Sequence, residues 1–368
     1  MDDAARTLPA RPAPDVVDLA LELMRAESTS GAEQAAVAAV DALLRDRGWR
    51  TTRVPVSDGR DDVFAEADGV PAEVVLSTHL DTVPPYTPPR LADGRLWGRG
   101  ACDAKGIAAA MICAAERLRA RAVPVGLLFV VGEETTHDGA LAADAAQPTV
   151  APRVRALVNG EPTESTLATG TKGALRFRLR TTGRAAHSAY PHLGDSATSR
   201  LARLLVELEG VALPHDAVLG ATTINVGGLA GGVADNVIAP WAEARCMARL
   251  VTPEDDVRRA LEAWLAPHVA AGRAEVAYGP MVPPVRLATV PGFRTGVVAF
   301  ATDVPALPSW GTPYLFGPGS IHVAHTDGEY VDVAELRDAV GAYERLAVAA
   351  LGGPAGQTAP PSAPAASS

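Results

Sequence analysis

Short apolar runs that each end in a histidine or a carboxylate constrain the fold of this chain more than any other feature. Residues 74–76 lead into His79 and Asp81, residues 123–131 into Glu133 and Glu134, and residues 154–158 into Glu161. Such runs predict buried strands, and the helical patterns between them predict a mostly parallel sheet covered by helices. Because open α/β sheets hold their sites beyond the carboxyl ends of the strands, we expect these side chains to meet at one edge.

Two further segments carry residues of the same types. Asp103 comes just before a helical pattern at residues 107–119, where an ordinary helix cap would also explain it, and the run 314–316 leads into His322 and His325. Each case alone is common where loops leave a sheet, but the repeated arrangement favours a shared metal site. Two histidines, one aspartate and two glutamates suit two divalent ions bridged by one carboxylate. The lack of cysteine in this set favours zinc, with cobalt or manganese as alternatives.

Six motifs resemble those of the di-zinc aminoacylase and carboxypeptidase family, which includes acetylornithine deacetylase and succinyl-diaminopimelate desuccinylase. They lie in the family's order between residues 74 and 333, and they read THLDTVP, GRGACDAKG, GEE, NGEPT, GRAAHSAYP and GPGSIHVAHTDGE. The resemblance covers most of the chain. It implies a catalytic domain that binds two metals, with an inserted domain that serves as a lid and dimer interface.

The resemblance also implies a set of metal ligands. His79 and Glu161 would hold one ion, Glu134 and His325 would hold the other, and Asp103 would bridge them. The residues alone do not choose between His322 and His325, so this choice comes from the family pattern of a histidine shortly before an acid.

Three catalytic roles follow from the same resemblance. Glu133 would be the general base that takes a proton from the metal-bridging water, and Asp81 would orient His79, as a carboxylate behind a ligand histidine commonly does. His187 would polarise the scissile carbonyl from the partner subunit, although a lone histidine in a turn of small residues is more often structural. We interpret the remaining histidines as structural or exposed: His137, His192, His215 and His268.

Three more residues are candidates for substrate binding, and two of them, Asn236 and Arg249, match family positions that contact the substrate. Asn236 would hydrogen-bond it, Arg249 would pair with its carboxylate, and Gly319 would offer a backbone amide or simply form a turn. An alternating strand also exposes every second residue, so Arg249 has an ordinary explanation. The sequence departs from the family pattern here, because Ala239 precedes Pro240 and Met247 replaces an aspartate. The substrate pocket is therefore the least defined part of the prediction.

The hydrophobic period predicts a domain boundary near residue 173, and the resemblance implies that the chain returns to the metal-binding domain near residue 287. We expect an α/β metal-binding domain at residues 14–173 and 287–353, and an inserted α+β domain at 174–286 in which the order βαββαβ forms a small sheet with two helices on one face. The strict alternation at residues 176–180 marks the change of pattern. Residues 1–13 and 354–368 are expected to be disordered tails, because they are rich in small residues and proline.

Composition sets limits on the environment and partners. Three cysteines in 368 residues form no disulfide framework, and no secretory signal or membrane-spanning run is evident, so we expect a cytoplasmic protein. A net charge of −10 argues against nucleic-acid and anionic-membrane partners. The expected assembly is a homodimer, on the resemblance alone.

The sequence therefore predicts a metal-dependent amidohydrolase that removes the acyl group from an N-acylated amino acid, in the manner of acetylornithine deacetylase. A dipeptidase or carboxypeptidase using the same residues is the enzymatic alternative, since these motifs do not report what flanks the scissile amide. A catalytically silent relative that binds a ligand is the alternative of another class. A serine or cysteine hydrolase is disfavoured, because Cys102 has no evident base nearby in sequence.

Overall fold

The protein is described by a computed structural model that covers residues 14–57 and 59–352. The two predicted disordered tails lie outside these described residues. None of the described helices has the length and apolarity needed to cross a membrane.

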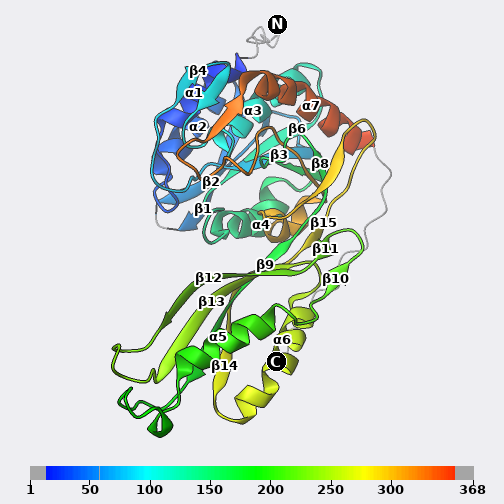
Figure 1. Cartoon of the computed structure of the whole chain (residues 1–368). Coiled ribbons are helices and arrows are strands. Elements are labelled where there is room, and N and C mark those ends of the chain that lie inside the picture. Colours follow the sequence, from blue (N-terminus) through cyan, green and yellow to red (C-terminus); the bar gives the residue numbers. More distant parts are fainter. Residues whose placement is uncertain (1–13, 58, 353–368) are drawn as a thin grey trace, which may run out of the picture.

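A six-stranded sheet lies at the centre of the upper part of the molecule in Figure 1. Its order is β1-β2-β6-β3-β7-β17, in which the last four strands run parallel and β2 pairs antiparallel with both of its neighbours. The bounds are β1 Trp49–Ser57, β2 Arg60–Ala67, β3 Val74–His79, β6 Val125–Val130, β7 Ala156–Asn159 and β17 Thr312–Leu315. The predicted mixed α/β fold with a mostly parallel sheet is confirmed.

Helices cover both faces of this sheet. One face packs against α1 Val16–Arg25, α2 Gln34–Asp46, α3 Lys105–Ala120 and α7 Val333–Gly352, and the other against α4 Asp138–Val150 and the 3-10 helices η2 Val304–Ala306 and η3 Pro308–Trp310. Within β3, Val74 and Leu76 enter the first core and Val75 enters the second. Burial on both faces explains why the strand is apolar at successive positions rather than at alternate ones.

The strands β3, β6 and β7 end at the same edge of the sheet. His79, the last residue of β3, pairs with Val130 at the end of β6, and Ser77 pairs with Asn159 at the end of β7. The polar segments that follow these three strands therefore leave the sheet side by side.

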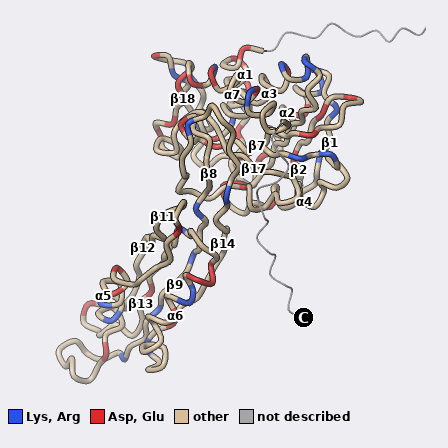
Figure 2. The backbone as a smooth tube through the Cα atoms, turned by 90° about the vertical axis from the view of Figure 1, so that its right-hand side faces the viewer, with Lys and Arg blue, Asp and Glu red and all other residues tan. Residues whose placement is uncertain are grey.

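A separate four-stranded antiparallel sheet extends away from the first, as Figures 1 and 2 both show. Its order is β12-β13-β9-β14, and the chain builds it as βαββαβ with a small hairpin inserted after the first helix. The bounds are β9 Gly173–Thr182, α5 Ala197–Leu208, β10 His215–Asp216, β11 Gly220–Ala221, β12 Thr223–Gly231, β13 Trp241–Leu250, α6 Glu254–Ala270 and β14 Ala274–Val282. Leu175, Phe177 and Leu179 share a core with α5 and α6, and the arginines between them lie on the opposite, uncovered face.

Short strands complete the fold around these two sheets. The strand β8 runs directly into β9 and pairs with β15 and β16, so it marks the junction of the two parts. A third small sheet has the order β18-β5-β4. The remaining bounds are β4 Arg90–Ala92, β5 Arg95–Trp97, β8 Leu167–Thr171, β15 Val285–Arg286, β16 Thr295–Val298, β18 Tyr330–Asp332 and η1 Pro191–Leu193.

Candidate active site

Asp103 lies between two histidines, at the edge where the parallel strands end. Its Oδ1 is 3.0 Å from Nε2 of His79, and its Oδ2 is 3.2 Å from Nε2 of His325. The helix α3 begins two residues later and is capped by Ala104 without a side-chain hydrogen bond. Asp103 is therefore not a helix cap, and each of its two oxygens faces a different histidine.

A glutamate completes a group of three on each side of Asp103. His79, Asp103 and Glu161 offer ligand atoms that all lie within 4.8 Å of one another, and the same holds for Asp103, Glu134 and His325. Glu134 Oε1 is 2.9 Å from Nε2 of His325. The two groups share Asp103 only, which is the arrangement that a carboxylate-bridged metal pair requires.

The residues present fit divalent ions on two observations. Oε1 of Glu161 is buried and has no hydrogen-bond partner within the described chain, although a buried carboxylate oxygen is normally paired. In addition, burial raises the pKa of Glu133 and of Glu161 well above the usual range, and the hydrogen bonds with Asp103 and Glu134 raise the pKa of His325 to about 10. Neighbouring carboxylates add to the effect of burial on the pKa of Glu133 and of Glu161, and a bound cation would offset this accumulation of acidic groups.

Asp81 ties the two neighbouring strand ends together. Its carboxylate accepts hydrogen bonds from the backbone N–H groups of Glu133 at 3.1 Å and Glu134 at 3.2 Å, and from the hydroxyl of Ser30 at 2.7 Å. Nδ1 of His79 is 3.4 Å from the Asp81 carboxylate but 2.9 Å from the Asp81 backbone carbonyl. Asp81 thus orients the glutamate pair at least as directly as it orients His79.

A buried ion pair holds the backbone at Asp103 in place. Nη1 of Arg99 lies 2.6 Å from Oε2 of Glu329, and the two side chains are only 2% and 1% exposed. The other oxygen of Glu329 accepts the N–H groups of Cys102 and Asp103, each at 3.3 Å. Gly319 packs against the same segment with φ of 84°, where an added Cβ would lie 2.5 Å from Cβ of Cys102. Packing alone therefore requires glycine at that position.

Replacing Arg99 with glutamine should lower the free energy of unfolding by about 3–5 kcal/mol, because it leaves the buried Glu329 carboxylate without its charged partner. Chemical denaturation of the two proteins measures this. The matched control is Arg95→Gln, which breaks the Arg95–Asp332 pair whose side chains are 39% and 50% exposed. That change should leave the free energy of unfolding close to that of wild type, because an exposed ion pair contributes little. Equal losses for the two variants would contradict the structural role of the buried pair.

A third group of carboxylate and imidazole side chains lies beside the first two. Glu133, His137 and Asp303 bring their polar atoms within 4.8 Å of one another. His137, interpreted from the sequence as structural or exposed, is partly buried, and its Nδ1 lies 2.9 Å from Oδ1 of Asp303. Sequence reasoning also missed Asp303, because no periodic pattern links residues 166 positions apart.

Comparison with known proteins identifies the family. The profile of peptidase family M20/M25/M40 matches residues 75–349. The chain belongs to peptidase family M20/M25/M40. A relative from Aspergillus terreus that bears the name "Probable carboxypeptidase" is 39% identical over 375 residues, covering 90% of this chain and 85% of the relative. A relative of the same type from Aspergillus fumigatus is 38% identical over 379 residues, with the same coverage of 90% and 85%. This M20 family chain is therefore a metallohydrolase that acts on amide bonds.

Solved structures share the fold of this M20 chain. A tripeptidase from Staphylococcus aureus superposes with a TM-score of 0.77 at 19% identity, covering 92% of this chain and 98% of that one. An M20 family metallo-carboxypeptidase from Sulfolobus solfataricus gives 0.68 at 16% identity, with coverage of 91% and 98%. A dinuclear metal binding peptidase from Bacillus subtilis gives 0.69 at 18% identity, with coverage of 92% and 98%. The fold of this chain thus agrees with its membership of the M20 family.

His187 and Asn236 do not join the three groups within this chain. They lie in adjacent loops, where the N–H of Ser188 donates to the carbonyl of Asn236 at 2.9 Å, beyond the end of β9 that is far from the junction. The ten residues of β9 at about 3.3 Å each span roughly 30 Å. Both residues are therefore far from Asp103 of the same chain.

Arg249 lies nearer to the junction, at the start of the uncovered sheet face. It pairs in register with Ala174, the second residue of β9, and forms no ion pair with any residue in the described ranges. Burial and the neighbouring charge of Arg176 lower its pKa. A partly buried guanidinium without a partner is suited to bind a carboxylate.

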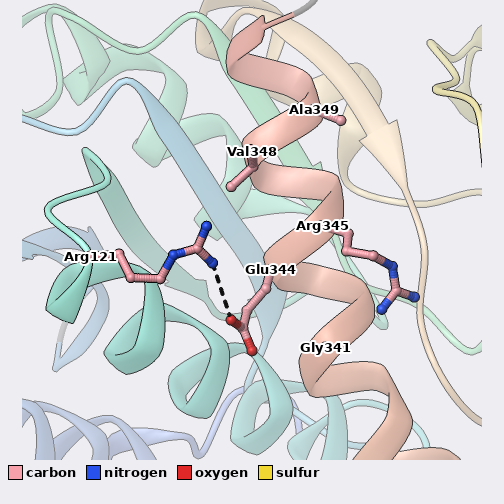
Figure 3. A pocket seen from close by; sticks show the side chains of 6 residues that line it. All are labelled: Arg121, Gly341, Glu344, Arg345, Val348 and Ala349. Atoms are coloured by element: carbon pink, nitrogen blue, oxygen red, sulfur yellow. Dashed lines mark ion pairs between the residues drawn. The ribbon is translucent and has the colours of Figure 1, made fainter.

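A surface hollow of about 480 Å³ lies away from these residues, between the end of α3 and α7 (Figure 3). It is lined by Arg121, Gly341, Glu344, Arg345, Val348 and Ala349. Glu344 already pairs with Arg117 at 3.0 Å and Arg121 at 3.6 Å. The hollow therefore offers a surface with more arginine than glutamate, and it contains none of the motif residues.

Proposed function

We propose that this chain is a carboxypeptidase-like enzyme that hydrolyses the amide bond before a terminal amino acid and releases that amino acid with its free carboxylate. The single observation that carries this proposal is the placement of Asp103, whose two oxygens face two histidines that each have a second acidic neighbour. Family membership and the names of the two Aspergillus relatives favour the peptidase form of the reaction over the deacylase form.

The ligand assignment follows from the two groups that share Asp103. His79 and Glu161 would hold one ion, Glu134 and His325 the other, and Asp103 both. Imidazole and carboxylate ligands without thiolate favour zinc, and cobalt can replace it. Two such ions would polarise the scissile carbonyl and make a water acidic near neutral pH.

Glu133 is then free to act as the base. Its neighbour Glu134 lies 2.9 Å from His325, whereas Oε1 of Glu133 lies 4.0 Å from Nδ1 of His137, so the two side chains have different neighbours. Glu133 would take a proton from the attacking water and deliver it to the leaving nitrogen.

The proposed substrate carries a free carboxylate that Arg249 binds. Asn236 and the backbone of Gly319 would complete the substrate contacts, the former from a partner chain because it lies far from Asp103 in its own. N-acyl amino acids such as acetylornithine present the same carboxylate next to the scissile amide. They form the second substrate class here, although the sequence motifs alone favoured them as the first.

A substrate panel separates these forms. Purified protein with added zinc or cobalt is assayed on N-blocked dipeptides, free dipeptides, and N-acetyl, N-succinyl and N-formyl amino acids, with C-terminally amidated peptides as the matched control. We expect release of the terminal amino acid from peptides with a free carboxylate and none from their amides. Cleavage confined to N-acyl amino acids would instead establish the deacylase form, and cleavage of the amidated peptides would contradict the role of Arg249.

The position of His187 leads us to propose a homodimer in which this residue serves the partner's site. Replacing His187 with alanine should lower kcat, because a hydrogen-bond donor to the developing oxyanion is lost. Mixing His187→Ala and Glu133→Gln chains should restore activity, since a mixed dimer combines an intact base with an intact donor in one site. No restoration after subunit exchange, or a monomer in light scattering, would contradict action across subunits.

A further inference from the structure

We propose that His137 is a positioning residue for the base Glu133, and that Asp303 holds its imidazole in place. Nδ1 of His137 lies 2.9 Å from Oδ1 of Asp303 and 4.0 Å from Oε1 of Glu133. The inference rests on the proposed role of Glu133. It adds a second set of contacts to that glutamate, beyond those of the ligand groups.

Two separate segments converge to build this contact, because Glu133 and His137 belong to the one loop between β6 and α4. Glu133 follows β6, His137 directly precedes α4, and Asp303 comes just before η2 after the chain has passed through the four-stranded sheet. The side chains become more buried from His137 at 22% exposure to Glu133 at 11% and Asp303 at 1%. The imidazole therefore spans from a buried acid to the partly open site.

The backbone of His137 adopts a conformation that a side chain disfavours. Its φ is 54°, in the left-handed region, and its N–H donates to the carbonyl of Gly132 at 2.8 Å to close a tight turn. A residue other than glycine costs about 1 kcal/mol there. Glycine would make the same turn without this cost, so the geometry points to a use for the ring.

The hydrogen bond with Asp303 gives the ring a fixed direction. A carboxylate that accepts from one imidazole nitrogen sets the orientation of the whole ring. Here the same Nδ1 also approaches Glu133, so a fixed ring limits the positions open to the Glu133 carboxylate. The base must reach both the attacking water and the leaving nitrogen, and a misplacement of about 1 Å can cost about 10²-fold in rate.

A purely structural role makes a different prediction. The His137–Asp303 contact also joins the turn before α4 to the segment before η2, and a tie of that kind would affect stability alone. Glycine at position 137 removes the ring and relieves the backbone, so it separates the two roles. Ala122→Gly is the matched control, because Ala122 is exposed and has φ of 55°.

The first experiment measures kcat and KM on the best substrate of the panel for wild type, His137→Gly, Asp303→Asn and the double variant, with unfolding and metal content measured on each. We expect His137→Gly to lower kcat about 10- to 100-fold with KM within about twofold, and added imidazole to restore part of kcat in this variant but not in wild type or Ala122→Gly. The double variant should lose little more than either single one. Unchanged kcat in His137→Gly, no rescue by imidazole, or a third bound ion lost on substitution would overturn the proposal.

A second readout needs no substrate and keeps this inference separate from the proposed function. Crystal structures of three metal-loaded forms show where the Glu133 carboxylate lies: wild type, His137→Gly, and His137→Gly with added imidazole. We expect it to move away from position 137 in the variant and to return when imidazole occupies the space. An identical Glu133 conformer in all three would overturn the positioning role, whether or not a panel substrate is hydrolysed.

Discussion

Glu133→Gln is expected to lower kcat by about 10²- to 10⁴-fold, because glutamine fills the same space but cannot take a proton from water. The change leaves both groups of proposed ligands intact, so metal content and the free energy of unfolding should stay close to those of wild type. Steady-state kinetics and elemental analysis on the same preparation measure these quantities together.

The matched control for this change is Glu22→Gln, an exposed glutamate of α1 at the same charge difference. It should retain wild-type kcat and metal content. If Glu133→Gln instead loses its metal with its activity, Glu133 is a ligand and the assignment of base and ligand in the glutamate pair is wrong.

Asp103→Ala is expected to abolish hydrolysis and to leave fewer than two ions per chain. Asp103 is the only residue shared by the two ligand groups, so its loss removes a ligand from both and frees His79 and His325 from their common partner. Loss of a ligand should lower activity more than loss of a positioning residue, because it weakens the binding of the ions themselves.

Glu134→Ala is the comparison for Asp103→Ala, because it removes a ligand from one group only. We expect one tightly held ion to remain in that variant and metal binding to weaken at both positions in Asp103→Ala. Two ions bound to Asp103→Ala with wild-type affinity would contradict a bridging role.

The sequence could predict the parts of the site that follow the sheet. His79, Glu134 and Glu161 come at or just after the ends of neighbouring parallel strands, and such ends meet at one edge for geometric reasons. Asp103 and His325 lie on loops, and their roles came from resemblance to a family rather than from any periodicity. The hydrophobic pattern also could not predict that β2 runs antiparallel to its neighbours, because a buried strand has the same pattern of apolar residues in either direction.

The contacts of His137 could not be predicted, because they depend on a turn and on a partner far away in sequence. A histidine before Asp138-Gly139 reads as an ordinary loop residue, and only the fold brings Asp303 to it. The distance of His187 from Asp103 is likewise a property of the length and direction of β9 and not of the motif around it.

Metal content measured together with hydrolysis tests the central claim most directly. The purified chain is stripped with a chelator, reloaded with increasing zinc or cobalt, and assayed on N-blocked dipeptides at each step. The account predicts no turnover without metal and activity that rises to a plateau near two ions per chain. Hydrolysis at an undiminished rate after stripping would contradict a metal-dependent mechanism, and two bound ions with no turnover of any panel substrate would favour the catalytically silent relative.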